Sequence, residues 1–93
     1  MTRPPNDVVE LSICISYYDA PDYLSRCINS IHNSDTRCKY EILVVDDASP
    51  RPCTEAVTAV FPDACVIVNS ENLGYAKANN LLIDTAVGHF VLV

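Results

Sequence analysis

Glycine is scarce in this sequence, with only two among 93 residues. Two glycines and six prolines exclude a collagen-like or low-complexity chain, and no internal repeat is visible. Neither GxGxxG nor GxxxxGK[ST] occurs, so the sequence supports neither a dinucleotide-binding fingerprint nor a P-loop. With 49% hydrophobic and 19% charged residues, the composition is that of one globular domain.

Basic residues are also few. Six Lys and Arg stand against twelve Asp and Glu, which gives a formal net charge of −6. An acidic surface repels phosphate backbones, and the scattered cations form no basic patch, so no nucleic-acid partner is expected. A divalent cation could still reconcile an acidic site with an anionic phosphate ligand.

No cysteine pair has the CxxC spacing of a metal site, and the number of cysteines, five, is odd. We therefore expect reduced thiols, which fit a cytoplasmic location. The first seven residues lack the apolar region of a signal peptide, and no apolar run approaches the ~20 residues of a membrane span. The five cysteines are Cys14, Cys27, Cys38, Cys53 and Cys65.

Short apolar runs alternate with amphipathic ones along the chain. The pattern predicts strands at 9–16, 40–46, 65–69 and 89–93, and helices at 21–33, 54–61 and 75–86. This alternation predicts an α/β fold, a three-layer parallel sheet with helices on both faces. We expect a tail over 1–8 and a domain over 9–93. Because the chain finishes inside an apolar run, we expect this domain to be truncated after its fourth strand.

Several details of the helices follow from the same pattern. Pro21 suits a first helical turn, Thr54 can cap the second helix, and Gly88 can end the third. The inward stripe of the first helix is expected to comprise Tyr23, Leu24, Cys27, Ile28 and Ile31. That of the third helix is expected to comprise Tyr75, Ala78, Leu82, Ile83 and Ala86.

Polar residues follow three of the predicted strands. In open parallel sheets, ligands bind beyond the carboxyl ends of the strands. Asp46 and Asp47 end the second strand, where their mutual repulsion needs a compensating cation or N–H donor. Tyr17 and Tyr18 follow the first strand and offer flat faces for stacking. Ordinary turn and core-edge roles remain open for all four residues.

The segment 71–80 opens the third helix. Gly74 can adopt turn dihedrals that other residues resist, and the helix N-terminus behind it offers N–H groups to an anion. Lys77 adds positive charge, and Asn79 and Asn80 are unusual inside a helix. The alternative is that Asn72 only caps this helix and that the other polar residues are solvated.

Taken in order, these segments resemble family 2 glycosyltransferases of the GT-A fold, which are Rossmann-like. The resemblance rests on LSICISYYD at 11–19, CINSI at 27–31, YEILVVDDAS at 40–49 and ENLGYAKANN at 71–80. It implies that Ser16 and Tyr18 flank the base of a nucleotide. It also implies that Asp47 accepts a hydrogen bond from a uracil-type imide, while Asp46 shapes the turn.

The same resemblance places Asn72, Gly74, Lys77 and Asn80 on the ribose-diphosphate side of the site. Asp19 belongs to the same nucleotide-sugar site, although the family often has Asn at this position. Ala48 stands where the family often has Gly or Asn.

The resemblance implies an inverting transfer of a sugar from a nucleoside-diphosphate donor, of the uridine or thymidine type, to a saccharide or lipid-linked acceptor. Cell-envelope polysaccharide synthesis and membrane association of a full-length protein are implied in the same way. Mn²⁺ or Mg²⁺ would be the cofactor. The family's metal-binding Asp-x-Asp follows the strand that begins at His89, and its catalytic base lies further on. We therefore name no catalytic or metal residue, expect this chain alone to be inactive, and expect self-association through its last strand.

Two other functions stay open. The run Ile42-Leu-Val-Val-Asp-Asp also resembles the opening of a response-regulator receiver domain, with paired acids beside a phosphoacceptor Asp. Such a domain has no use for the 72–74 loop or for Asn79 and Asn80. A non-catalytic interaction module that keeps the fold is the third possibility.

Overall fold

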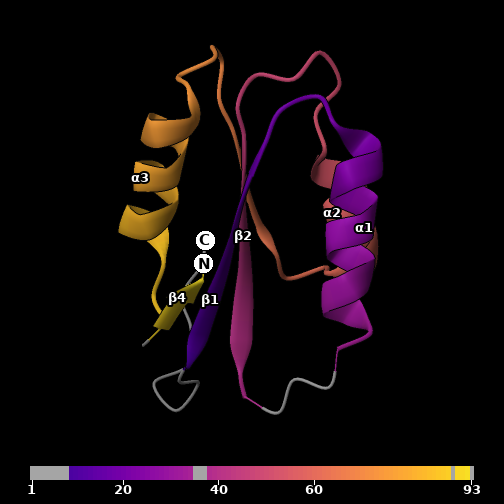
Figure 1. Ribbon diagram of the computed structural model, residues 1–93, viewed down its shortest axis with the longest axis vertical. Helices are drawn as coiled ribbons and strands as arrows, with labels where there is room; N and C mark the ends of the chain where they lie inside the picture. The colour runs from indigo at the N-terminus through magenta and orange to yellow at the C-terminus, as the bar shows by residue number, and fades with distance from the viewer. Residues whose placement is uncertain (1–8, 35–37, 89, 93) are drawn as a thin grey trace.

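The computed structural model describes residues 9–34, 38–88 and 90–92. Figure 1 shows its strands and helices alternating along the chain. They are β1 (Leu11–Tyr17), α1 (Pro21–His32), β2 (Tyr40–Asp46), α2 (Thr54–Val60), β3 (Cys65–Val68), α3 (Tyr75–Thr85) and β4 (Phe90–Leu92). Every predicted strand and helix is confirmed, with bounds shifted by two residues or fewer. The expected tail 1–8, His89 and Val93 lie outside the described residues.

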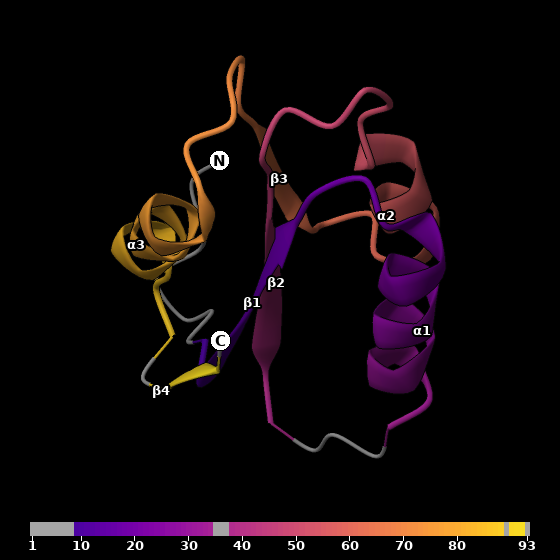
Figure 2. The same ribbon diagram turned by 45° about the horizontal axis from the view of Figure 1, so that its top comes forward.

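The strands form one parallel sheet in the order β3-β2-β1-β4. In the register, Ile13 lies opposite Ile42 on β2 and opposite Leu92 on β4. Helices α1 and α2 cover one face of the sheet and α3 covers the other (Figure 2). The predicted three-layer α/β fold is therefore confirmed.

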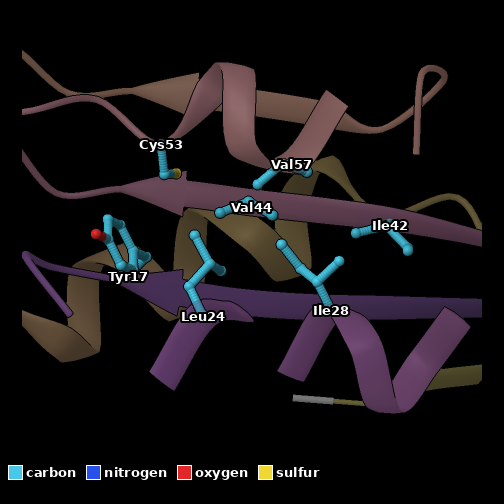
Figure 3. Packing of buried hydrophobic residues seen from close by; sticks show 7 residues of the cluster. All are labelled: Tyr17, Leu24, Ile28, Ile42, Val44, Cys53 and Val57. Carbon is cyan, nitrogen blue, oxygen red and sulfur yellow. The ribbon is translucent and has the colours of Figure 1, made fainter. Parts of the chain in front are cut away.

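β2 is the central element of the core. Its side chains alternate between the two faces and are buried on both, as expected for the apolar run of an inner parallel strand. On one face, Ile42 and Val44 pack against Leu24 and Ile28 of α1 and against Val57 of α2 (Figure 3). The α1–α2 layer is therefore fixed to the sheet by aliphatic packing.

The other face of β2 is covered by a narrower contact. Leu43 and Val45 pack against Ala78 and Leu82 of α3. The prediction that Tyr75 and Ile83 also face inward is wrong, since their side chains are 72% and 49% exposed. The face that meets the sheet consists of Ala78, Leu82 and Ala86 with Leu81 beside them. Successive side chains are turned by about 100° around a helix, so Ile83, which follows Leu82, points away from the sheet. On α1, Tyr23 is likewise 57% exposed, against the prediction.

The helix ends differ in part from the expectation. Pro21 occupies the first turn of α1, as predicted. The N-cap of α2 is Cys53 with no side-chain cap bond, so the prediction that Thr54 caps this helix is wrong. α3 ends at Thr85 with Ala86 as its C-cap, so Gly88 does not end the helix.

Gly88 instead lies against the amino end of β1. Its N–H donates to the Ser12 hydroxyl at 2.8 Å, and the Val87 N–H donates to the Glu41 carboxylate at 2.8 Å. Ser12 and Glu41 are both buried, and the Ser12 hydroxyl donates to Glu41. This network ties the segment after α3 to the start of β1 and β2, at the end of the sheet opposite the polar strand ends.

All five cysteines are free thiols, as expected. α1, with 12 residues, is the longest helix in the part of the chain that the structure describes, and no helix there is long and apolar enough to cross a membrane.

Candidate functional site

The connections that follow β1, β2 and β3 lie together at one end of the sheet (Figures 1 and 2). Parallel strands bring their carboxyl ends to the same edge, and this edge carries the polar residues singled out above. Asp46 and Asp47 at the end of β2 accept hydrogen bonds from the connection that follows β2 and from the connection that follows β3. Asp46 and Asp47 are therefore the central residues of the candidate site.

Asp46 organises the connection between β2 and α2. Its carboxylate is fully buried and accepts the N–H of Ser49 at 3.0 Å and the N–H of Cys53 at 2.8 Å. Burial alone would raise the pKa of Asp46, but hydrogen bonds from Ser49 and Cys53 outweigh burial and hold the pKa below its ordinary value. Burial and the Asp46 charge raise the pKa of the Cys53 thiol to about 12, so that thiol is protonated.

Asp47 reaches the connection between β3 and α3. Its Oδ1 accepts the Leu73 N–H at 2.8 Å and the Asn69 side-chain amide at 3.0 Å, and its Oδ2 accepts the Gly74 N–H at 2.9 Å. The donors Leu73, Asn69 and Gly74 lower the pKa of Asp47 against the opposing effect of burial. The two adjacent carboxylates thus each accept N–H groups, from different connections.

The connection between β1 and α1 is joined to the same turn. The Asp19 N–H donates to the Ser49 hydroxyl at 2.8 Å, and the Asp47 N–H donates to the Tyr17 carbonyl at 2.9 Å. Asp19 has a φ of 43°, in the left-handed region that Asp and Asn tolerate better than other residues. The ends of all three strands are therefore linked by hydrogen bonds through the 46–49 turn.

Ala48 has a φ of 66°, in the left-handed region. Its backbone is strained there, because the Cβ lies too close to the following carbonyl oxygen. We expect Ala48→Gly to raise the free energy of unfolding by about 0.5–1 kcal/mol, because the relief of strain exceeds the entropic cost that glycine adds to folding. Urea denaturation followed by circular dichroism measures the change. As a control, Ala56→Gly on the exposed face of α2 should lower stability by about 1 kcal/mol. Loss of stability in both variants would contradict the expectation.

The remaining predicted residues lie around this edge with differing exposure. Ser16 is half-buried near the end of β1, and Tyr18 just beyond it is 53% exposed. Gly74 is the N-cap of α3 with φ 88° and ψ 160°, a conformation open essentially to glycine alone. Its N–H also donates to the Asn72 side chain at 3.0 Å. Asn72, Lys77 and Asn80 are exposed, so these side chains are accessible to a ligand.

Some residues that organise this edge were not predicted as site residues. Asn69 and Ser49 supply side-chain hydrogen bonds, and Cys53 and Leu73 supply backbone N–H groups. The signal available in the sequence was the polar residue Asn69 at the end of the predicted apolar strand 65–69. Asn79 was noted as unusual in a helix, and its buried side-chain oxygen has no hydrogen-bond partner among the described residues.

A metal site does not fit the residues present. Over 9–34, 38–88 and 90–92, no group of three or more His, Cys, Asp or Glu could hold a metal ion. The paired carboxylates Asp46 and Asp47 are engaged by N–H donors. We therefore assign no metal-dependent step to these residues.

The comparisons with known proteins agree with this architecture. A family model described as Glycosyl transferase family 2 matches residues 12–93. The chain belongs to this family. The match covers the polar strand ends and the segment 71–80, and it favours a glycosyl transferase over a receiver domain.

Curated relatives of this chain come from several bacteria. It is 33% identical over 86 residues to an uncharacterised glycosyltransferase of Nostoc sp., covering 89% of this chain and 26% of the relative. It is 30% identical over 82 residues to an uncharacterised protein of Mycobacterium tuberculosis, covering 87% and 25%. It is 28% identical over 79 residues to a teichoic acid poly(glycerol phosphate) polymerase of Staphylococcus epidermidis, covering 81% and 11%.

Solved structures show the same fold. The crystal structure of TarS 1-349 of S. aureus matches with a TM-score of 0.81 and 26% identity over 90% of this chain and 26% of that one. The crystal structure of S. aureus TarS matches with a TM-score of 0.79 and 26% identity, covering 16% of that chain. The chain thus has the GT-A fold and spans about a quarter or less of the length of these relatives.

Proposed function

We propose that this chain is the sugar-nucleotide-binding portion of an inverting glycosyltransferase, which transfers a sugar from a nucleoside-diphosphate donor to an acceptor. The observation that carries the proposal is the Asp47 carboxylate. It is buried at the ligand-binding edge of the sheet, and its Oδ2 accepts a single N–H from the described residues. A carboxylate oxygen can accept two hydrogen bonds, so Oδ2 can still receive the imide N–H of a uracil or thymine base.

The residues around Asp47 favour a nucleotide as the ligand over a simple anion. Tyr18 is exposed just beyond β1, where its ring can stack on a base, and Ser16 lies two residues before it. On the other side, Asn72, Lys77 and Asn80 are exposed on the α3 side and can bind the ribose and diphosphate. The neutralising charge on that side comes from Lys77.

In the proposed reaction, the acceptor hydroxyl displaces the nucleoside diphosphate at the anomeric carbon, which inverts its configuration. The residues of this chain bind and orient the leaving nucleotide through its base, ribose and phosphates. A divalent cation, Mn²⁺ or Mg²⁺, would neutralise charge on the leaving diphosphate when bound to the full-length enzyme. We propose that this chain alone binds the donor without transferring its sugar.

The acceptor and the cellular setting are further parts of the proposal. The teichoic acid polymerase among the relatives supports a saccharide or lipid-linked acceptor of the cell envelope. A cytoplasmic location, with membrane association of the full-length protein, is consistent with such an acceptor. β4 lies at the edge of the described sheet, and such an edge can pair with a second copy of the chain. Light scattering that shows only monomer would contradict that pairing.

Calorimetric titration with UDP tests the proposed nucleotide site. We expect UDP to bind, and Tyr18→Ala to weaken binding about tenfold, since stacking on an aromatic ring is worth roughly 1–3 kcal/mol per base. Tyr23→Ala is the matched control, because Tyr23 is exposed to a similar degree, 57% against 53%, but lies on α1. It should leave the affinity unchanged.

Absence of UDP binding would contradict the proposal, as would equal effects of the two tyrosine substitutions. Sugar transfer catalysed by the 93-residue chain alone would contradict the proposed inactivity but not the nucleotide site. Phosphorylation of the chain by acetyl phosphate with Mg²⁺ would instead indicate receiver-like chemistry.

A further inference from the structure

Asn69 connects the two aspartates at the end of β2. It follows the last residue of β3, and its backbone N–H donates to the Asp46 carbonyl at 2.8 Å. Its side-chain amide donates to Asp47 Oδ1 at 3.0 Å. The backbone of Asn69 is thus fixed by one aspartate while its side chain holds the other.

The hydrogen bonds on Asp47 are unequally divided between its two oxygens. Oδ1 accepts two donors, the Asn69 amide and the Leu73 N–H, whereas Oδ2 accepts only the Gly74 N–H. Because each carboxylate oxygen accepts about two hydrogen bonds, Oδ1 is filled and Oδ2 keeps one open position. Asn69 supplies the only side-chain donor to Asp47 within the described residues.

We propose that Asn69 is a positioning residue that fixes the Asp47 carboxylate so that Oδ2 alone meets the base, and that it thereby sets base selectivity. This inference rests on the proposed nucleotide-binding function. A uracil ring offers an N–H donor at the position where cytosine offers a lone pair. Oδ2 accepts the first and repels the second, whereas an open position on Oδ1 accepts the exocyclic amine of cytosine and so reduces this discrimination.

The two backbone donors do not replace Asn69. The Leu73 N–H holds Oδ1 and the Gly74 N–H holds Oδ2, so these two donors by themselves leave one open position on each oxygen. Asn69 approaches from the end of β3 and closes the second position on Oδ1. Without it, Oδ1 keeps an open position as well, and both oxygens can compete for the ligand.

The experiment compares UDP and CDP, which differ only in the base, by calorimetric titration at pH 7. We expect the wild-type chain to bind UDP about tenfold more tightly than CDP, as one hydrogen bond to a charged group allows. Asn69→Ala and the near-isosteric Asn69→Asp, which both lack the amide donor, should bring this ratio close to one. Asn29→Ala, on the exposed face of α1, is the matched control and should keep the wild-type ratio.

The ratio of UDP to CDP affinity distinguishes a positioning role of Asn69 from a general structural role. If Asn69 only supports the fold, both variants will weaken UDP and CDP alike, and the inference is overturned. An unchanged ratio in a folded Asn69→Asp, checked by circular dichroism, overturns it too. Equal binding of UDP and CDP by the wild type overturns the inference and leaves nucleotide binding standing, whereas binding of neither overturns both.

Discussion

Asp46→Ala is expected to lower the free energy of unfolding by about 4 kcal/mol, measured by urea denaturation with circular dichroism. The substitution leaves the buried N–H groups of Ser49 and Cys53 without an acceptor. Each unsatisfied group costs about 1–3 kcal/mol, and the lost side chain adds a cavity. For a small domain with a total stability of about 5–15 kcal/mol, this is a large share.

Two further variants make the result for Asp46 interpretable. Asp46→Asn retains one acceptor oxygen and should lose about half as much stability. Asp84→Ala removes an exposed carboxylate of α3 and should change stability by about 0.5 kcal/mol or less. Equal stability of the two alanine variants would show that the Asp46 hydrogen bonds do not hold the turn.

Gly88→Ala is expected to lower the free energy of unfolding by about 3 kcal/mol, since added atoms in a packed site force the backbone apart. A Cβ at this position would lie 2.6 Å from the Ser12 hydroxyl oxygen, 2.7 Å from the Ser12 nitrogen and 2.9 Å from the Leu11 carbonyl carbon. Two of these atoms belong to the backbone of β1 and cannot move aside. Thermal and urea denaturation measure the loss.

Gly74→Ala provides the comparison for Gly88. No atom lies within 4 Å of a Cβ at Gly74, but its φ of 88° is strained for alanine, so a cost of about 1–2 kcal/mol is expected from the backbone alone. Adding Ser12→Ala to Gly88→Ala removes only the hydroxyl clash and should restore little stability. A Gly88→Ala variant as stable as the wild type would refute the close approach to β1.

Local sequence patterns were sufficient to predict most of the fold. The apolar run Ile42–Val45 identified the central strand, since such a run is buried on both faces of a parallel sheet. The inward face of α3 was predicted too broadly, with Tyr75 and Ile83 included. An amphipathic pattern shows which side of a helix is apolar, but the width of the contact depends on how the partner surface is shaped, which only the tertiary structure shows.

The sequence predicted where the polar edge of the sheet lies, but not the hydrogen bonds that organise it. The positions of Asp46 and Asp47 after a buried strand indicated a ligand-binding edge. The donors that satisfy them come from 49, 53, 69, 73 and 74, and four of these five donors are backbone N–H groups. Backbone donors carry no residue signature, so their partners follow from the path of the chain alone. Asn69 donates through its side chain, and it was missed as a partner of Asp47 because the sequence alone does not show that the end of β3 lies beside the end of β2.

The hydrogen bond between Gly88 and Ser12 has a consequence for how the chain folds. It joins positions 76 residues apart, and β4 pairs with β1, the first strand of the chain. During synthesis on a ribosome, β1 therefore lacks one neighbour until nearly all of the 93 residues have emerged. Topologies dominated by such distant contacts fold slowly, because the entropy of closing a long loop is lost before the contact forms. The open side of β1 is thus the surface that a chaperone would need to protect in the nascent chain.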